Sequence, residues 1–408
     1  MDRALMGEPV IHGTVAAGFE PVRAAFVQNV KRGGEIGAGL CITHRGETVV
    51  DLWAGVADRA TGRPWGPDTL NVVFSVTKGM AATALLMLAD RGLLDYDRPV
   101  AHYWPEFAAH GKEAITVRTL LCHRAGLVAL DEPLTLDDFE QRPEKVARAC
   151  AEQHPFWAPG TDQGYHGVTY GPYVAELFRR VAGESIGTFL AREVAGPLGA
   201  DVYLGAPEHV RDRVATNYPV GKVEAATQVI PKLLLHRGTE GRVYRQVAFK
   251  GLAAKAFGNP PELGAKGMNN WNDPRVQRLE LPWANAVASA RGLARVYAAL
   301  ANGGAVDGVR LVQPEVIEPL FARQSWSERD RILRRPMGWS QGFVKEGPAI
   351  FSPNLESFGH PGAGGSLGWC DPKARVSIGY VINRMGHHIR SPRALALCKA
   401  LYASPGLQ

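Results

Sequence analysis

One serine and one lysine stand three positions apart at the start of a predicted helix, as Ser75-Val76-Thr77-Lys78. Residues i and i+3 share a helix face, so the Lys78 amine can reach the Ser75 hydroxyl. A serine needs an adjacent base to act as a nucleophile, and a lysine is a base near neutral pH only where its pKa is lowered. The pair could therefore make Ser75 a nucleophile, but alone it is a weak signal. The structural alternative is a helix N-cap serine followed by a surface lysine.

A tyrosine and a glycine-rich segment could complete such a site. Tyr165 lies in the loop FWAPGTDQGYHG, residues 156–167, where it could serve as a phenolate base if a nearby lysine lowered its pKa. The segment GHPGAGGS, residues 359–366, contains glycines that let backbone N–H groups approach an oxyanion. The structural alternatives are a loop aromatic residue packed on the core and a plain turn.

Two further patterns resemble functional motifs. Gly364-Gly365-Ser366-Leu367-Gly368 matches the G-x-S-x-G nucleophile elbow. That elbow requires a following helix, whereas the sequence after Ser366 predicts a strand, so we do not expect Ser366 to be the nucleophile. The pair His387-His388 has no ligand partner at useful spacing, so we expect a solvent-exposed loop there and no metal site.

Composition excludes several classes of protein. The chain has 408 residues, net charge +6 and 46% hydrophobic residues, which predicts one large domain or two joined lobes. The apolar run 79–89 is too short to span a membrane, and the first residues lack the apolar core of a signal peptide. The basic stretch Arg329–Arg335 lacks interleaved aromatics, so we interpret it as a solvated loop and expect no nucleic-acid partner. Five widely spaced cysteines favour a reducing compartment, and we expect a cytoplasmic protein.

Apolar periodicity predicts strands near the two ends of the chain and helices between them. We expect a mixed α/β lobe from residues 1–78 and 283–408, with a central antiparallel sheet flanked by helices. Residues 79–282 would form an inserted, mainly helical lobe, with the active site between the lobes. Segment 219–282 is irregular and allows no clear prediction. The predicted helices are 15–32, 76–91, 117–123, 144–153, 173–181, 186–194, 289–302 and 392–402; the predicted strands are a hairpin around His44–Glu47, then 70–74, 340–345, 367–371 and 376–382.

Four of these pieces together resemble the serine β-lactamase and penicillin-binding-protein superfamily. The similarity is to its class C-like branch and most of all to the family VIII carboxylesterases, across residues 15–400. The motifs occur in the family's order: S-x-x-K at residues 75–78, LLCHRAGL at 120–127, PGT with Tyr-His-Gly at 159–167, and His-Pro-Gly at 360–362. The resemblance implies a β-lactamase-like fold and a metal-independent serine hydrolase without a cofactor.

The resemblance also implies roles for individual residues. Ser75 would be the acylated nucleophile, Lys78 its partner base, and Tyr165 the general base that activates Ser75 and later the deacylating water. The oxyanion hole would consist of the backbone N–H groups of Ser75 and Ala363, or Gly364 if the alignment shifts by one. Substrate contacts would come from His360, Gly362 and His166.

Two departures from the family favour an esterase over a β-lactamase. Gly167 stands where many relatives have an asparagine amide, and His360 stands where β-lactamases have a permanently charged lysine. We therefore expect a carboxylesterase that acts on short-chain or small cyclic esters through an acyl-enzyme. The alternatives are a β-lactamase, DD-peptidase or acyltransferase with the same residues, or a non-catalytic scaffold of the same fold. The sequence does not specify acyl preference or oligomeric state.

Overall fold

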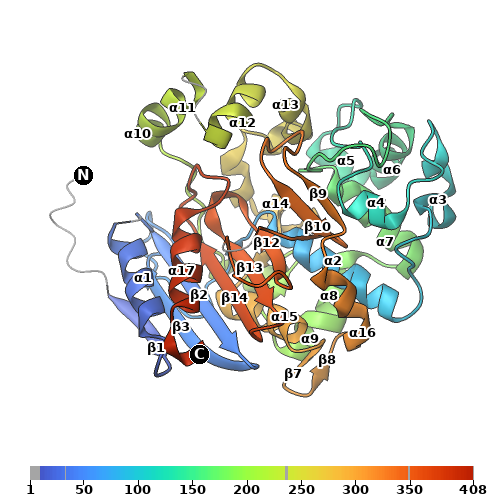
Figure 1. Ribbon diagram of the computed structural model, residues 1–408. Helices are drawn as coiled ribbons and strands as arrows, with labels where there is room; N and C mark the ends of the chain where they lie inside the picture. Colours follow the sequence, from blue (N-terminus) through green and yellow to red (C-terminus); the bar gives the residue numbers. More distant parts are fainter. Residues whose placement is uncertain (1–9, 33, 235–237, 348–349, 408) are drawn as a thin grey trace.

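The computed structural model describes residues 10–32, 34–234, 238–347 and 350–407, and its centre is a nine-stranded antiparallel sheet (Figure 1). The strand order is β1-β3-β2-β14-β13-β12-β11-β10-β9, so the first and last parts of the chain pair through β2 and β14. The strands are β1 Ile11–Val15, β2 Gly37–His44, β3 Glu47–Gly55, β9 Ser325–Ser327, β10 Met337–Ser340, β11 Phe343–Val344, β12 Phe358–Pro361, β13 Leu367–Asp371 and β14 Val376–Ile382.

Alternation along β14 explains how the sheet is buried on two faces. Ile378 and Tyr380 pack into the hydrophobic cluster that also contains residues of helices α1 (Glu20–Lys31) and α17 (Pro392–Tyr402). The alternate residue Gly379 faces α15 (Ala290–Ala301), and a Cβ at Gly379 would lie 2.1 Å from the backbone oxygen of Ala290. Glycine at this position therefore lets α15 pack directly on the sheet.

Helices dominate the middle of the chain. Helix α2 (Val76–Asp90) runs through the interior, and every residue from Val76 to Leu88 is buried. A three-stranded sheet in the order β4-β6-β5 lies where the chain enters α2. The strands of this small sheet are β4 Asn71–Val72, β5 Val202–Tyr203 and β6 Val287–Ala288. The other helices of the middle region are α3 Val100–Tyr103, α4 Val117–Leu121, α5 Leu136–Gln141, α6 Pro143–Glu152, α7 Tyr170–Ala182, α8 Ile186–Leu190 and α9 Gly196–Leu198. Later in the chain follow β7 Ala305–Val306, β8 Val309–Arg310 and α16 Pro314–Ile317.

Residues 219–282, which we call the cap segment, contain short helices in a stretch whose sequence pattern allowed no clear prediction. Helices α10 to α13 lie together along the upper edge of the molecule in Figure 1. The helices of the cap segment are α10 Lys222–Glu224, α11 Ile230–Leu234, α12 Gly238–Ala248, α13 Leu252–Phe257 and α14 Pro274–Arg278.

The observed architecture confirms the predicted α/β class, with a central antiparallel sheet flanked by helices, but it contradicts one of the predicted strands. The single strand predicted for 340–345 is wrong, because the chain turns there and forms β10 and β11 instead. Gln341 and Gly342 have φ values of 46° and 91°, the left-handed conformations of a tight hairpin turn. The division into lobes 1–78 with 283–408 and 79–282 stays a proposal. Among the described residues, no helix has the length and hydropathy of a transmembrane span.

Candidate active site

Ser75 stands at the entrance to helix α2, after a turn with an unusual backbone. Phe74, directly before it, has φ 48°, and its ring packs edge-on against Trp271 with centroids 5.4 Å apart. Such a conformation is costly for a residue with a Cβ and persists only where packing holds it. The start of the helix is also held by a segment distant in sequence, because the Ala286 N–H donates to Thr77 Oγ1 at 3.0 Å. The surrounding structure therefore fixes the position of the Ser75 side chain.

The Lys78 side chain is fully buried beneath Ser75. Its Nζ lies 3.3 Å from Ser75 Oγ and donates to the backbone oxygens of Gly167 and Trp283, each at 2.8 Å. Burial lowers the pKa of Lys78 well below its ordinary value. A neutral amine has two N–H groups, which match the two carbonyls, and its lone pair is then left for the Ser75 hydroxyl. The geometry provides a buried base for Ser75.

The Tyr165 hydroxyl also contacts Ser75, donating to Ser75 Oγ at 2.9 Å. The Tyr165 ring stacks on Trp339 at 5.5 Å and 8° between planes, and Lys78 Nζ lies 5.0 Å from the Tyr165 ring centroid. Burial raises the pKa of Tyr165, outweighing the opposing hydrogen bond with Ser75. The resting site therefore favours a neutral phenol that donates a proton, rather than the phenolate that the sequence analysis made conditional on a lowered pKa.

Asp330 holds the Tyr165 loop, although the sequence analysis did not identify it. Its Oδ1 accepts the backbone N–H groups of Tyr165 (3.1 Å), Ile332 (2.9 Å) and Leu333 (2.9 Å). The residue is fully buried, so the interpretation of Arg329–Arg335 as a solvated loop is wrong at its centre. The sequence feature that could have identified Asp330 is a single carboxylate near two apolar residues inside a run of arginines.

The glycine-rich segment approaches the nucleophile by its backbone. A Cβ at Gly362 would lie 2.3 Å from the backbone oxygen of Val73, so glycine lets this segment pack against the strand leading to Ser75. Gly364 has φ 86°, a conformation that favours glycine. Within the described backbone, no hydrogen bond uses the N–H of Ser75, Ala363 or Gly364 as donor. These groups are available to a developing oxyanion, as expected for Ser75 with Ala363 or Gly364.

Among the predicted substrate contacts, His360 and Gly362 line the pocket around Ser75, whereas His166 does not. His360 Nδ1 lies 2.8 Å from the Pro361 oxygen, an acceptor, so Nδ1 carries the proton. Burial, with a smaller effect of Lys78, lowers the pKa of His360 to about 3, and the ring is neutral. The His166 side chain is fully buried, and its backbone N–H donates to His123 Nδ1 at 3.0 Å. We therefore assign His166 no substrate contact.

Ser366 lacks the geometry of a nucleophile elbow. It is buried and outside the residues that line the pocket. The chain continues from it into strand β13 and not into a helix. Ser75, Lys78 and Tyr165 are thus the predicted residues that the structure brings together.

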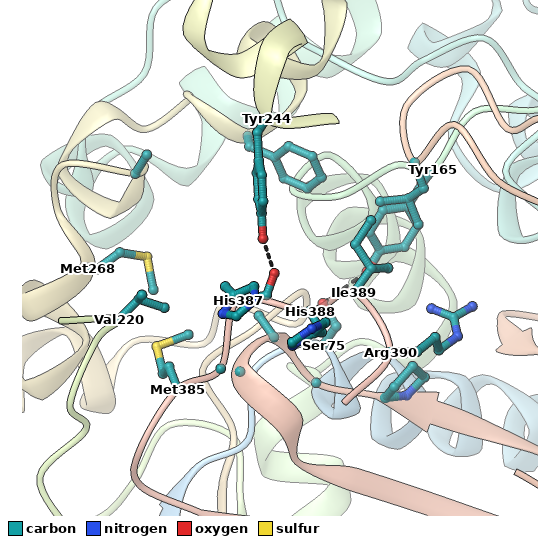
Figure 2. Close-up of a pocket in the computed structure, with 18 of the residues that line it drawn as sticks. Ser75, Tyr165, Val220, Tyr244, Met268, Met385, His387, His388, Ile389 and Arg390 are labelled. Atoms are coloured by element: carbon teal, nitrogen blue, oxygen red, sulfur yellow. Dashed lines mark hydrogen bonds between the residues drawn. The ribbon is translucent and has the colours of Figure 1, made fainter. Parts of the chain in front are cut away.

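A mostly apolar cavity of about 670 Å³ opens above Ser75 and Tyr165. In Figure 2, Ser75 and Tyr165 lie on one side of it, and Val220, Met268 and Met385 lie on the other. The cap segment supplies much of this wall; its lining residues are Pro219, Val220, Val229, Tyr244, Phe257, Ala265, Lys266, Met268 and Asn269.

His387 and His388 also line the pocket, so the prediction of a solvent-exposed loop there is wrong. The His387 imidazole contacts Glu224 Oε1 through Nδ1 (3.1 Å) and Lys232 Nζ through Nε2 (3.2 Å), and Tyr244 donates to the His387 carbonyl. Through these contacts the loop binds helices α10 to α12 of the cap segment. Within the described parts of the chain, no group of three or more His, Cys, Asp or Glu residues could hold a metal ion.

Comparisons with known proteins agree with this geometry. The family model described as Beta-lactamase matches residues 22–399. The Esterase/beta-lactamase LipL of Mycobacterium tuberculosis is 37% identical over 358 residues, covering 86% of this chain and 77% of LipL. The crystal structure of a family VIII carboxylesterase superposes with a TM-score of 0.82 and 38% identity, covering 97% and 99% of the two chains. A penicillin-binding protein homolog from Caulobacter crescentus superposes with a TM-score of 0.81 and 37% identity, covering 97% and 99%.

Proposed function

This chain belongs to the beta-lactamase family as a serine hydrolase of the family VIII carboxylesterase type, and we propose that it hydrolyses short-chain or small cyclic esters through an acyl-enzyme on Ser75. The observation that carries the proposal is that Ser75 Oγ contacts Lys78 Nζ and the Tyr165 hydroxyl at the base of an apolar pocket.

Acylation begins with neutral Lys78 and neutral Tyr165. Ser75 Oγ attacks the ester carbonyl carbon as its proton passes to Lys78 Nζ, and the carbonyl oxygen becomes an oxyanion that the Ser75 and Ala363 N–H groups stabilise. As the intermediate collapses, the C–O bond to the alcohol breaks, and Tyr165 gives its hydroxyl proton to the departing oxygen. The products of this step are the free alcohol, acyl-Ser75, a Lys78 ammonium and a Tyr165 phenolate.

Deacylation reverses the two proton transfers. The Tyr165 phenolate accepts a proton from water, and the water oxygen attacks the acyl carbon. When the second intermediate collapses, the bond from the acyl carbon to Ser75 Oγ breaks, and Lys78 returns its proton to Ser75. The carboxylic acid leaves, and Ser75, Lys78 and Tyr165 regain their resting states. The resting pKa directions of Lys78 and Tyr165 support this order of events.

The lining of the pocket supports an ester over a β-lactam substrate. His360 is neutral and presents no permanent cation to a substrate carboxylate. Gly167 offers no side-chain amide to hold a polar acyl group. Val220, Met268 and Met385 provide an apolar wall that suits the hydrocarbon part of a small ester. A β-lactam, a D-alanyl peptide and acyl transfer to an added alcohol are the competing reactions.

Hydrolysis of p-nitrophenyl butyrate by wild type, Ser75→Ala and Ser366→Ala tests the proposal. We expect steady turnover in wild type and Ser366→Ala and none above background in Ser75→Ala, with all three proteins folded. A fluorophosphonate probe read by intact mass should add to wild type and not to Ser75→Ala. Loss of activity in Ser366→Ala alone would contradict the assignment of the nucleophile. If wild type neither hydrolyses any ester nor forms an adduct with the probe, the scaffold alternative would be favoured.

A further inference from the structure

Gly167 and Phe257 fit together beside the nucleophile. A Cβ at Gly167 would lie 2.3 Å from Cε1, 2.8 Å from Cδ1 and 3.1 Å from Cζ of the Phe257 ring. Real Cβ atoms essentially never come this close to another heavy atom, so a side chain at residue 167 and the Phe257 ring cannot occupy their positions together. Gly167 belongs to the loop 156–167 that carries Tyr165, and Phe257 ends helix α13 of the cap segment, so distant parts of the chain form this pair.

The backbone at Gly167 does not itself require glycine. Gly167 is not among the glycines of the described chain that have positive φ, so other residues could adopt its conformation. The three heavy atoms nearest to the added Cβ all belong to the Phe257 ring. The steric requirement for glycine at this position therefore comes from Phe257.

Gly167 lies next to the reacting groups. Its backbone oxygen accepts the hydrogen bond from Lys78 Nζ at 2.8 Å, and Lys78 Nζ lies 3.3 Å from Ser75 Oγ. The Phe257 ring lines the same pocket as Ser75, and its centroid lies 6.4 Å from that of the Tyr165 ring. An aromatic ring thus lines the pocket of the nucleophile near Tyr165, in the space that a side chain at residue 167 would enter.

We infer that Phe257 determines the acyl specificity of this enzyme, by filling the space next to Gly167 and forming an aromatic wall beside Ser75. The inference rests on the proposed esterase function and adds the substrate class: esters whose acyl group is apolar next to the carbonyl. An acyl group that carries an amide at that place would put a polar N–H and C=O against the ring. Burial of such groups without partners is unfavourable, so these esters react more slowly.

Four proteins test the inference: wild type, Phe257→Ala, Gly167→Asn and the double variant. The probes are p-nitrophenyl butyrate, whose acyl group is a plain chain, and p-nitrophenyl hippurate, whose acyl group carries an amide next to the ester. We expect wild type to favour butyrate in kcat/KM by at least about tenfold, the size of effect that one unpaired polar group gives. In the double variant, where the introduced asparagine has space and offers an amide, the ratio should shift toward hippurate by at least about tenfold.

Gly167→Asn alone should lose at least about tenfold in kcat/KM for each ester, because the new side chain collides with the ring beside Tyr165. Phe257→Ala should rescue this loss in the double variant. The melting temperature provides a readout independent of turnover: Gly167→Asn should lower it, and the double variant should recover it relative to the sum of the two single changes. Phe249→Ala removes an exposed phenylalanine of the same cap segment and should alter neither the activity nor the ratio.

The possible failures are distinguishable. Absence of ester turnover in wild type overturns the proposed function. If wild type hydrolyses esters but all four proteins have the same ratio of kcat/KM for butyrate and hippurate, the specificity inference is overturned and the esterase proposal stays intact. Wild-type activity and melting temperature in Gly167→Asn would show that a side chain at residue 167 and Phe257 do not exclude each other, and would overturn the inference as well.

Discussion

Helix α2 and the cap segment meet at one pocket but are held in very different ways. Helix α2 carries Lys78 at its first turn, and all residues from Val76 to Leu88 are buried in the main core. The cap segment carries four of the eight exposed large hydrophobic side chains among the described residues: Val223, Ile230, Leu234 and Phe249, with exposed fractions from 46% to 78%. Its helices α10 to α12 make polar contacts with the loop around His387, and its later part contacts residues 131–140 and 185–187 of the body.

The difference indicates that the reacting groups and the residues that recognise the substrate lie in different parts of the molecule. The groups proposed to move protons lie on an interior helix and a loop fixed by buried hydrogen bonds, where small displacements would be costly. The cap segment, which supplies part of the apolar wall, leaves more of its large hydrophobic side chains exposed. We therefore expect changes in the buried floor of the site to abolish turnover, and changes in the cap segment to alter substrate range or affinity.

The largest effect is expected from Lys78→Arg. A guanidinium keeps its charge and cannot accept the Ser75 proton, so kcat/KM for p-nitrophenyl butyrate should fall about 10²- to 10⁴-fold, as for loss of a positioned base. Because a buried arginine could also destabilise the fold, Lys78→Met provides a neutral comparison, and circular dichroism checks that each variant is folded. A Lys78→Arg enzyme with more than about a tenth of wild-type activity would contradict the role of Lys78 as base.

The pH dependence of wild type should show a loss of activity on the acid side. Burial lowers the pKa of Lys78, so the reactive neutral amine persists below the ordinary lysine value of 10.5 and disappears as pH falls through the lowered value. Well below that value, kcat/KM should fall about tenfold for each pH unit, because each unit reduces the neutral fraction tenfold. The measurement is kcat/KM for a non-ionising ester from about pH 5 to 10. An activity that rises only near the ordinary lysine value would show that Lys78 keeps an ordinary pKa.

Asp330→Ala should have a smaller effect, which acts through Tyr165. The change leaves the buried N–H groups of Tyr165, Ile332 and Leu333 without their acceptor. Each unpaired group costs about 1 to 3 kcal/mol, and displacement of Tyr165 should lower kcat by about tenfold. Asp330→Asn keeps one acceptor oxygen and should stay within about threefold of wild type. Equal loss of kcat in Asp330→Ala and Asp330→Asn would show that the charge, and not the hydrogen bonding, matters.

Asp330 also affects stability in a pH-dependent way. Burial raises the pKa of Asp330 from 3.8 to about 6, against the opposing hydrogen bonds from the loop backbone. A raised pKa in the folded state means that its contribution to stability is present below pH 3.8 and is lost as pH rises through about 6. Unfolding of Asp330→Asn in urea should therefore depend less on pH between about 4 and 7 than that of wild type. An unchanged pH dependence would contradict the raised pKa.

The sequence predicted the site best where the relevant spacing is local. Ser75 and Lys78 are three residues apart, so helix geometry alone brings them together. The predicted strands 367–371 and 376–382 and the helix 392–402 match β13, β14 and α17, because alternation and the N-terminal Pro392 are strong local signals. Lys78, by contrast, acquires its lowered pKa from burial, which no local pattern specifies.

The predictions from the sequence failed where long-range contacts determine the structure. The cap segment consists of short helices with little periodicity of their own, and they contact distant parts of the chain, such as the His387 loop for α12 and Glu140 for α14. Asp330 and His387 lie in stretches that look like solvated loops, but Asp330 is buried and the His387 side chain is largely covered, because a distant segment packs on each. The steric match of Gly167 and Phe257 is equally invisible in the sequence, since each residue explains the other only in three dimensions.

The smallest effect is expected from loosening the cap segment with Tyr244→Phe. Tyr244 donates to the His387 carbonyl across the pocket (Figure 2), and one such hydrogen bond contributes about 1 kcal/mol, or about fivefold in a local opening equilibrium. We expect KM for p-nitrophenyl butyrate to rise about two- to fivefold at constant kcat, and tryptic cleavage within the cap segment to accelerate by a similar factor. Tyr203→Phe, in β5, removes a tyrosine hydrogen bond to Asp201 outside the pocket and should change neither quantity. A fall in kcat with unchanged KM in Tyr244→Phe would show that the cap segment positions the reacting groups, and that reaction and recognition are not separated in this molecule.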